Sequence, residues 1–429
     1  MIFKTQTWWC LLKLILFTLT LCLIFAPSGF SQADSSFDLN QCIQMALEHS
    51  YLLKSDSMRV AEQTFTVDEA KSHYYPDLLG DVSHNQLYYG QYDFKQQSAL
   101  MLVDWSLGDW IRHTADSPQN TLLAKKADME DTRLRVSSQV AMLYINVLQK
   151  QTEQSRLQER LELLQEHYKV TQALWQAGIR TQLDVLQTEA EIQDTQSNQV
   201  LVQMDYDLYR RELGRLMQIP FDRIKLNSIS FNTDQPPESF LVSNSLLEHN
   251  PLMQSLQFQI QAELSKLNQV SASKLPHIQM NGGYVVDHDP TADGDYWIVG
   301  AGVQFPIMQW KRSFYQKQQV LASSKALQFQ QKAVERELNI RYDMLTERIH
   351  RLLDFRRLQQ QRSETSKKTY DIATANYQAG LVTNLEFLDA QQKYMEARIG
   401  LEQSRLDIVL NLIDLYIITQ DNTKLAQLQ

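Results

Sequence analysis

The sequence has few of the residues that build disulfide frameworks, metal centres or nucleic-acid surfaces. It contains three cysteines in 429 residues, and Cys10 and Cys22 lie in an apolar N-terminal stretch. Export would leave only Cys42, so no internal disulfide is expected. No cysteine and histidine cluster has metal-site spacing, and we expect neither metal nor cofactor. The net charge is −9 without a basic cluster, so nucleic acid is not an expected partner.

Long apolar runs are missing beyond the N-terminus. No later stretch reaches the roughly 18 apolar residues of a transmembrane helix, so any membrane crossing must be made by strands. The N-terminal apolar run, from Trp8 to Phe25, lies between the basic Lys4 and the small residues that end at Ala33. This order predicts a cleaved secretory signal peptide at residues 1–33. An uncleaved membrane anchor is the alternative.

What the sequence does contain is an internal duplication. Leu47-Glu48-His49-Ser50 recurs as Leu247-Glu248-His249-Asn250 at an offset of 200, and Gln176-Ala177-Gly178 recurs as Gln378-Ala379-Gly380 at an offset of 202. Such duplication dictates the architecture. We expect two repeats intertwined in one unit. The predicted segments are a first repeat at 34–220, a linker at 221–239, a second repeat at 240–419 and a tail at 420–429.

Both repeats show the same order of predicted elements: a helix that ends before a proline, two strands with a two-residue apolar period, a very long helix and a return helix. In the first repeat these are expected at 39–72, 77–88, 97–107, 112–176 and from 178 onward. In the second repeat they are expected at 246–273, 278–286, 296–305, 312–378 and from 380 onward.

The helix lengths predict a tube. About 65 residues give roughly 95 Å of helix, longer than a globular domain needs. The leading and return helices placed end to end are about as long together as the long helix. We therefore expect a wall in which a stacked pair flanks each long helix, and in which the long helices pack as in a coiled coil.

Four strands per chain cannot cross a bilayer alone, because an open sheet edge leaves unpaired backbone groups in the hydrocarbon. Two copies would give eight strands and three would give twelve, and both counts are allowed for outer-membrane barrels. Aromatic residues at both ends of the strands fit interfacial girdles; packing of a soluble sandwich is the alternative. The main candidate interface aromatics are Trp105, Trp110, Trp297 and Trp310.

Several strings, taken in order, resemble the TolC family of outer-membrane efflux proteins over nearly all of the mature length. They are Tyr75-Pro76-Asp77-Leu78, Trp105-Ser106-Leu107-Gly108-Asp109-Trp110, Tyr144-Ile145-Asn146-Val147-Leu148, and the signatures Ala177-Gly178-Ile179-Arg180-Thr181 and Ala379-Gly380-Leu381-Val382-Thr383. The resemblance implies a mainly α fold with a membrane β-barrel contribution. A long α-helical barrel would join four β-strands per protomer, completed as a trimeric twelve-stranded barrel.

The resemblance also implies a function without catalysis. Family members are passive ducts of tripartite efflux pumps or type I secretion systems in the outer membrane of Gram-negative bacteria. The implied partners are two further copies of the chain, outer-membrane lipid, a periplasmic adaptor and an inner-membrane pump of RND, ABC or MFS type. The alternative is a periplasmic adaptor or a coiled-coil envelope scaffold without a pore. An enzyme is not expected, because no nucleophile, base and orienting group recur with usable spacing.

Four residues match the channel entrance of the family. Glu386 and Asp389 lie three apart after the second tip and share one helix face, where three copies would form a carboxylate ring. Such a ring would favour cations and raise some carboxylate pKa values by mutual repulsion; an ordinary solvated face is the alternative. Tyr377 and Asp184 match positions that link neighbouring helices, as a phenol and carboxylate latch. Val382 departs from the pattern, since relatives often carry arginine there.

The remaining candidates are the two helical tips, which the resemblance assigns to adaptor docking. The glycines most simply supply a left-handed backbone at a helix end. Arg180 keeps a basic residue in the first repeat, where it would contact the adaptor or an acidic neighbour. The docking candidates are Gly178, Ile179, Arg180, Thr181, Gly380, Leu381 and Thr383.

Overall fold

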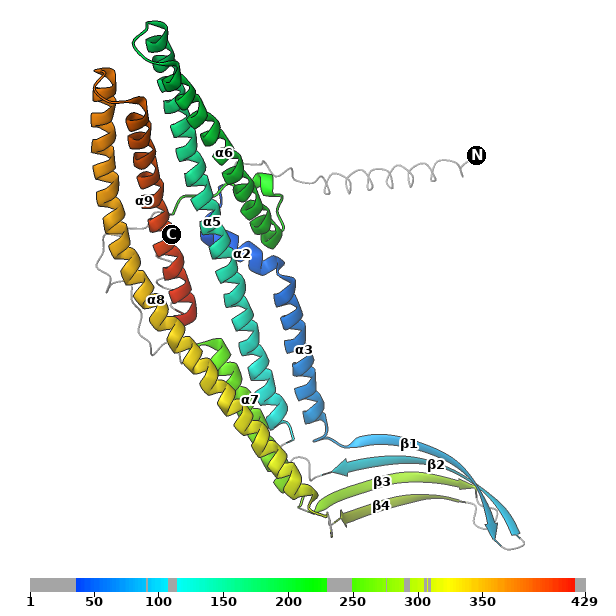
Figure 1. Ribbon diagram of the computed structural model, residues 1–429. Helices are drawn as coiled ribbons and strands as arrows, with labels where there is room; N and C mark the ends of the chain where they lie inside the picture. Colours follow the sequence, from blue (N-terminus) through cyan, green and yellow to red (C-terminus); the bar gives the residue numbers. More distant parts are fainter. Residues whose placement is uncertain are drawn as a thin grey trace, which may run out of the picture.

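The computed structural model describes residues 36–89, 92–106, 114–229, 249–274, 276–288, 294–304, 307 and 310–420. A long helical bundle stands on a four-stranded sheet (Figure 1). In chain order the elements are α2 (Leu39–His49), α3 (Tyr51–Ser72), β1 (Asp77–Tyr89), β2 (Tyr92–Ser106), α5 (Asp116–Gln176), α6 (Gln182–Met217), the 3-10 turn Phe221–Arg223, α7 (Pro251–Ala272), β3 (His277–His288), β4 (Gly294–Gln304), α8 (Arg312–Gln378) and α9 (Asn384–Thr419). The predicted signal peptide, the end of the linker and nearly all of the tail lie outside the described residues.

The leading helix of the first repeat is broken, where the sequence predicted one helix over 39–72. Ser50 adopts an extended backbone (φ −64°, ψ 114°) and its side chain accepts a hydrogen bond from the Leu53 N–H at 3.4 Å. In the second repeat Asn250 likewise accepts from the Leu252 N–H at 3.0 Å and begins α7, later than predicted. The repeated strings that end in Ser50 and Asn250 therefore mark helix N-caps, which serine and asparagine favour.

The long helices α5 and α8 contain 61 and 67 residues. Their lengths are therefore about 90 and 100 Å. The bounds of α8 agree with the prediction. The start of α5 at Asp116 is four residues later than predicted and places Pro118 in the first turn, where a missing N–H breaks no helical hydrogen bond.

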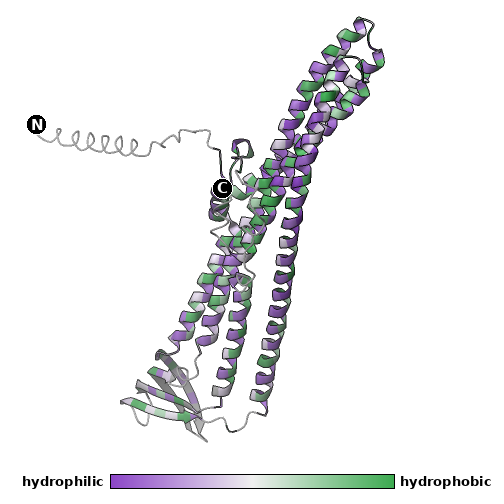
Figure 2. Ribbon diagram, turned by 90° about the vertical axis from the view of Figure 1, so that its left-hand side faces the viewer, coloured by the Kyte–Doolittle hydropathy of each residue, from purple (hydrophilic) through white to green (hydrophobic). Residues whose placement is uncertain are grey.

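Shorter helices flank the long ones in stacked pairs, as the lengths predicted. α5 contacts α3 and α7 in its half nearer the sheet, and α6 and α9 in its half nearer the tips (Figure 1). α8 is flanked by α7 and α9. Hydrophilic and hydrophobic residues alternate along these helices (Figure 2). No helix in the described ranges combines the length and the apolarity needed to cross a membrane.

The main core lies at mid-height, where α2, α5, α6 and α9 meet. The hydroxyl of the buried Tyr144 lies 3.2 Å from the carbonyl oxygen of Phe37 and 2.7 Å from that of Asn227. Phe37 also pairs with Leu226 in a parallel bridge, so the start of the described chain is fastened to the linker. Cys42 is buried in this core as expected, and burial raises the pKa of its thiol to about 12.

The sheet is an antiparallel meander with the order β1-β2-β3-β4. β2 begins at Tyr92, five residues before the predicted strand, because the β1 ladder continues through polar pairs such as Gln86 with Lys95. Backbone pairing needs no apolar side chains there. The register places a row of exposed apolar residues on one face. They are Leu78, Val82, Met101, Val103, Met280, Trp297, Val299 and Val303.

Candidate functional site

The two tips have the same backbone. Gly178 follows α5 and Gly380 follows α8, each with a φ of 75°, the left-handed region that glycine tolerates without a steric cost. The next residues, Ile179 and Leu381, are 67% and 75% exposed. Each tip therefore presents an apolar side chain to its surroundings, as a docking surface requires.

A capping box begins the return helix at both tips. The Thr181 hydroxyl accepts from the Asp184 N–H at 3.3 Å, and the Asp184 carboxylate accepts from the Thr181 N–H at 3.1 Å. In the second tip the corresponding distances between Thr383 and Glu386 are 3.2 and 2.8 Å. Two of the three predicted entrance carboxylates, Asp184 and Glu386, thus also stabilise helix starts.

Glu386 and Asp389 are both exposed in the first two turns of α9. The Glu386 carboxylate accepts from both the N–H and the hydroxyl of Thr383, and these bonds lower the pKa of Glu386. Asp389 lies 2.7 Å from the Lys393 ammonium. Within one chain the cap therefore acts against the upward pKa shift that we predict for a ring of three copies.

Tyr377 and Asp184, the expected latch, bind different partners in the described chain. The Tyr377 side chain is buried, and its hydroxyl lies 3.2 Å from Thr171 Oγ1. The Asp184 carboxylate is held by Thr181. Within the described chain Tyr377 therefore binds α5 and Asp184 binds its own cap, and the phenol and carboxylate latch stays a prediction.

A buried polar junction joins the tips, and sequence reasoning did not find it. His167 Nε2 of α5 donates to Asn384 Oδ1 of α9 at 2.7 Å, and the imidazole stacks on Phe387 with ring centroids 4.1 Å apart. Asn384 Nδ2 in turn donates to the Asp184 carbonyl at 2.9 Å and to Thr188 Oγ1 at 3.2 Å. Asn384 therefore connects three elements, α5, α6 and α9.

The electrostatics of this junction favour a neutral imidazole. Burial is the main cause of the lowered pKa of His167, and the positive charge of Arg180 acts in the same direction. The hydrogen bond to Asn384 and the charge of Asp184 oppose this shift. No local sequence pattern indicates this contact, because its two residues are 217 positions apart.

Three of the four predicted interface aromatics fall within the described residues. Trp105 Nε1 donates to the Tyr74 carbonyl at 3.1 Å where β2 approaches the helices, and Trp310 is 85% exposed just before α8. Trp297 lies near the opposite end of β4, with its ring centroid 5.1 Å from that of Tyr284. Trp110 is outside the described residues.

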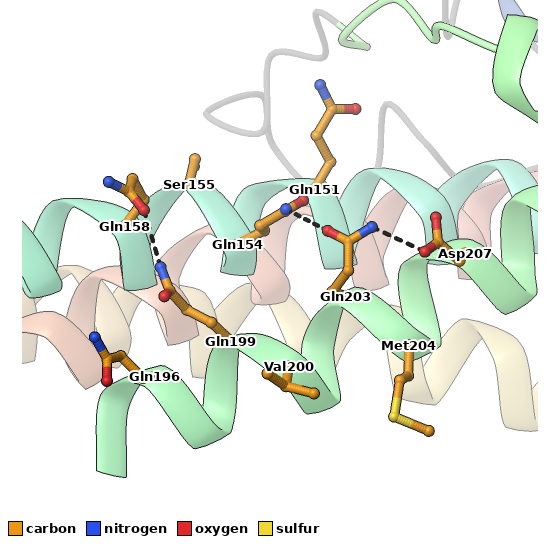
Figure 3. A pocket seen from close by; sticks show the side chains of 10 residues that line it. All are labelled: Gln151, Gln154, Ser155, Gln158, Gln196, Gln199, Val200, Gln203, Met204 and Asp207. Carbon is orange, nitrogen blue, oxygen red and sulfur yellow. Dashed lines mark hydrogen bonds between the residues drawn. The ribbon is translucent and has the colours of Figure 1, made fainter. Parts of the chain in front are cut away.

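A groove along α5 and α6 is lined mainly by glutamines (Figure 3). Gln154 Nε2 donates to Gln203 Oε1 at 2.5 Å, and Gln199 Nε2 donates to Gln158 Oε1 at 3.0 Å (Figure 3). The amides thus bind one another across the helix pair. This groove is a polar seam, and two hydrogen bonds between glutamine amides join α6 to α5 along it.

Long helical hairpins on an antiparallel sheet with one apolar face define the class of TolC-type outer-membrane channels. The chain belongs to the Outer membrane efflux protein family, whose model matches residues 42–217 and 242–419. It is accordingly an outer-membrane protein of a Gram-negative bacterium. The family match decides for the channel over the adaptor and scaffold interpretations.

Two relatives are pyoverdine export outer membrane proteins named OpmQ. The Pseudomonas putida protein is 22% identical over 404 residues, covering 88% of this chain and 84% of the relative. The Pseudomonas aeruginosa protein is 23% identical over 312 residues, covering 70% and 64%.

Solved structures share the fold. CusC superposes with a TM-score of 0.79 and 18% identity, covering 89% of this chain and 91% of CusC. VceC of Vibrio cholerae gives 0.76 and 17%, covering 89% and 95%.

Proposed function

We propose that three copies of this chain close twelve strands into one barrel and form a passive export duct. The observation that carries the proposal is the sheet: in the described ranges β1 and β4 each have one neighbouring strand, while one sheet face is apolar and exposed. Unpaired strand edges are unstable in hydrocarbon, and further copies would pair them. The apolar face would contact lipid, with Trp297 and Trp310 near its two rims.

The helical bundle supplies the periplasmic part of the duct. A periplasmic adaptor would dock on the tips, where exposed apolar residues recur in matching positions: Ile179 and Leu381, then Leu183 and Leu385. An inner-membrane pump would supply the energy. The names of the OpmQ relatives favour export of a small molecule over protein secretion.

The test of the duct is direct. The full-length protein, expressed with its leader, should sediment with the outer membrane when the cell envelope is fractionated. After purification in detergent it should have the mass of three chains and conduct ions in planar bilayers. A water-soluble monomer without conductance would refute the proposal. Crosslinking in the native envelope, followed by mass spectrometry, should capture one adaptor and one pump.

Glu386 and Asp389 form the entrance gate in this proposal. Changing both to alanine should reduce cation preference and block by divalent cations, because six carboxylates would leave the mouth of a trimer. The control changes Glu166 and Glu189, two exposed carboxylates near the first tip, to alanine. If the double alanine variant had the same cation selectivity as the wild type, Glu386 and Asp389 would not be part of the gate.

A further inference from the structure

The helices α8, α9, α5 and α6 follow one another in a row near the tips (Figure 1). α8 packs on α9, α9 on α5 and α5 on α6. α6 and α8 are therefore the two outer helices of the row. If the row is one section of a closed wall, these two helices are the ones that meet another molecule.

α6 has an apolar stripe on the side opposite its buried residues. The buried residues Thr188, Thr195 and Val202 are seven apart and face the bundle. The large apolar residues on the other side are each more than half exposed. They are Leu183, Leu186, Val200, Leu201, Met204 and Leu208. A row of exposed apolar side chains indicates an interaction surface.

α8 has a similar stripe in its half nearer the tips. Its exposed apolar residues there are separated by eleven, three and fourteen residues, and these spacings return to one side of a helix. They are Met344, Phe355, Leu358 and Ile372. The buried Ile349 and Gln359 belong to the other side. Both outer helices therefore present apolar side chains away from their own bundle.

The two tips of the chain lie at one level. Arg180 Nη2 of the first tip donates to the Tyr377 carbonyl at 3.2 Å and to the Val382 carbonyl at 3.1 Å in the second tip. A level along α6 can therefore be counted in residues from Gly178, and a level along α8 in residues from Gly380, at about 1.5 Å per residue.

The two stripes match level by level. Val200 and Leu358 each lie 22 residues from the tip glycine of their own helix pair. Leu186 and Ile372 each lie eight residues from it. In a ring of copies around an axis along the bundle, α6 of one copy would therefore place its apolar residues opposite those on α8 of the next copy.

The charges of the two helices are opposite over the same levels. From residue 182 to residue 207, α6 contains six acidic residues and no lysine or arginine. From residue 351 to residue 368, α8 contains six basic and two acidic residues. Asp194 and Arg362, both exposed, lie 16 and 18 residues from their tip glycines. Arg362 also lies 3.6 Å from Glu396 within the chain, but the two segments keep net charges of opposite sign.

This division of charge selects one kind of contact. Contact of α6 with α6 of another copy, or of α8 with α8, would bring like charges together, which is unfavourable. Contact of α6 with α8 brings together opposite charges and both apolar stripes. Such a head-to-tail contact uses a different surface on each partner and generates a ring when the rotation closes.

We propose that α6 of one copy docks on α8 of the next copy, and that the opposite charges of these two helices fix the head-to-tail order of the ring. This inference rests on the proposed function. The occupant of both surfaces is a second copy of this chain, because the two surfaces match each other in apolar residues, in charge and in level.

Cysteine crosslinking in the intact envelope tests the contact. V200C/L358C, treated with a short bismaleimide, should give covalent dimers and trimers of the chain in denaturing gels. V200C alone and L358C alone should stay monomeric, because each reactive residue needs the other surface. The matched control is V200C/I340C, since Ile340 is exposed on α8 but lies about 27 Å further from the tip. Cys42 is buried, so the wild type should not react.

The possible results separate this inference from the proposed function. Dimers of V200C alone or of L358C alone would overturn the head-to-tail order. A crosslink to a different protein, or equal crosslinking in V200C/I340C, would overturn the assignment of a second copy at this level. A trimeric, conducting V200C/L358C without crosslinks would overturn the inference and leave the channel intact. A monomeric wild type without conductance would refute the channel itself.

Charge reversal tests the role of the charges. D194R and R362D each place like charges across the contact, so each should increase the dissociated fraction of trimers in detergent about fivefold at low salt. D194R/R362D restores opposite charges and should assemble as the wild type does. The control is E162R, because Glu162 also lies 16 residues from Gly178 but is exposed on α5, inside the row.

Salt provides a further check on this pairing. The differences between the variants should shrink in about 0.5 M salt, which screens exposed charges. Single variants that behave as E162R does, or a double variant that dissociates as much as the single variants, would overturn the role of charge. If the single variants do not accumulate in the envelope, the double variant and the V200C/L358C crosslink still decide.

Discussion

Gly178 and Gly380 end the two long helices with the same backbone angle, whereas the residues that surround them differ. The shared features, a left-handed glycine and a capping box, are those that a helix needs in order to stop and restart. Several residues that the tips do not share make the contact between them. His167 and Arg180 of the first repeat donate, and Asn384 and the second-tip carbonyls accept.

The comparison shows how a duplicated motif can specialise. The backbone signals are retained because both copies must fold as hairpins. The side chains that face the other copy are free to become complementary. Experiments that change matched positions in both tips test this division directly.

The largest effect is expected at Asn384, the buried amide that connects α5, α6 and α9. N384A should lower the local stability of the tips by about 2 to 4 kcal/mol, because it leaves His167 and the Asp184 carbonyl without their partner. Amide hydrogen exchange over residues 376–390 measures this free energy. The matched control is Q182A at the exposed equivalent position in the first tip. Equal losses in the two variants would contradict the asymmetry.

The glycines should respond alike. G178A and G380A each force an alanine into the left-handed region, which costs about 1 to 2 kcal/mol. A Cβ at either position would have nothing within 4 Å, so no clash adds to this cost. Hydrogen exchange at each tip gives the two values. A difference much above 1 kcal/mol would mean that the tips are not equivalent even in their backbone.

Acid should weaken the junction through His167. Its pKa is lowered in the folded chain, so the unfolded chain binds a proton more readily. The stability is therefore present above the unfolded pKa of about 6.5 and is lost as the pH falls through the lower folded value. The protection factors at the tips, which correct for the slower intrinsic exchange in acid, should be lower at pH 5.5 than at pH 7.5 (both approximate test conditions). H167Q should reduce this pH dependence, and an unchanged pH profile would exclude His167 as its source.

The smallest effect concerns the second cap. T383A removes a hydroxyl that donates to Glu386 at 2.9 Å, so the pKa of Glu386 should rise toward its ordinary value. The pH at which cation preference disappears in bilayers should shift upward. T181A, the matched change in the first tip, should leave that pH unchanged. A downward shift in T383A would show that the ring of carboxylates, and not the cap, controls Glu386.

The sequence predicted the fold well where local signals act over long stretches. The bounds of α8 agree with the prediction, because Gly380 ends an uninterrupted helical pattern. The break at Ser50 was missed although its signal, the repeated strings ending in Ser50 and Asn250, was visible. The start of β2 was missed because polar residues continue the ladder without alternation.

The candidate site was harder to predict, because its key contacts join residues that are far apart in the sequence. His167 and Asn384 lie in different repeats, and neither stands out in its own helix. Asp184 was predicted to bind the Tyr377 phenol, whereas within the described chain the nearby Thr181 binds its carboxylate. Local capping competes with any longer-range bond, and spacing alone does not decide that competition.

The long helix of the first repeat packs against helices of the second repeat. α5 contacts α7 and α9 as well as α3 and α6, so each repeat completes its packing with surface supplied by the other. If the two repeats were expressed as separate polypeptides, the first repeat would expose the surface of α5 that contacts α7 and α9, and the second repeat would expose the matching surfaces of those helices. Joint expression should rescue them, as two pieces of one interlocking wall.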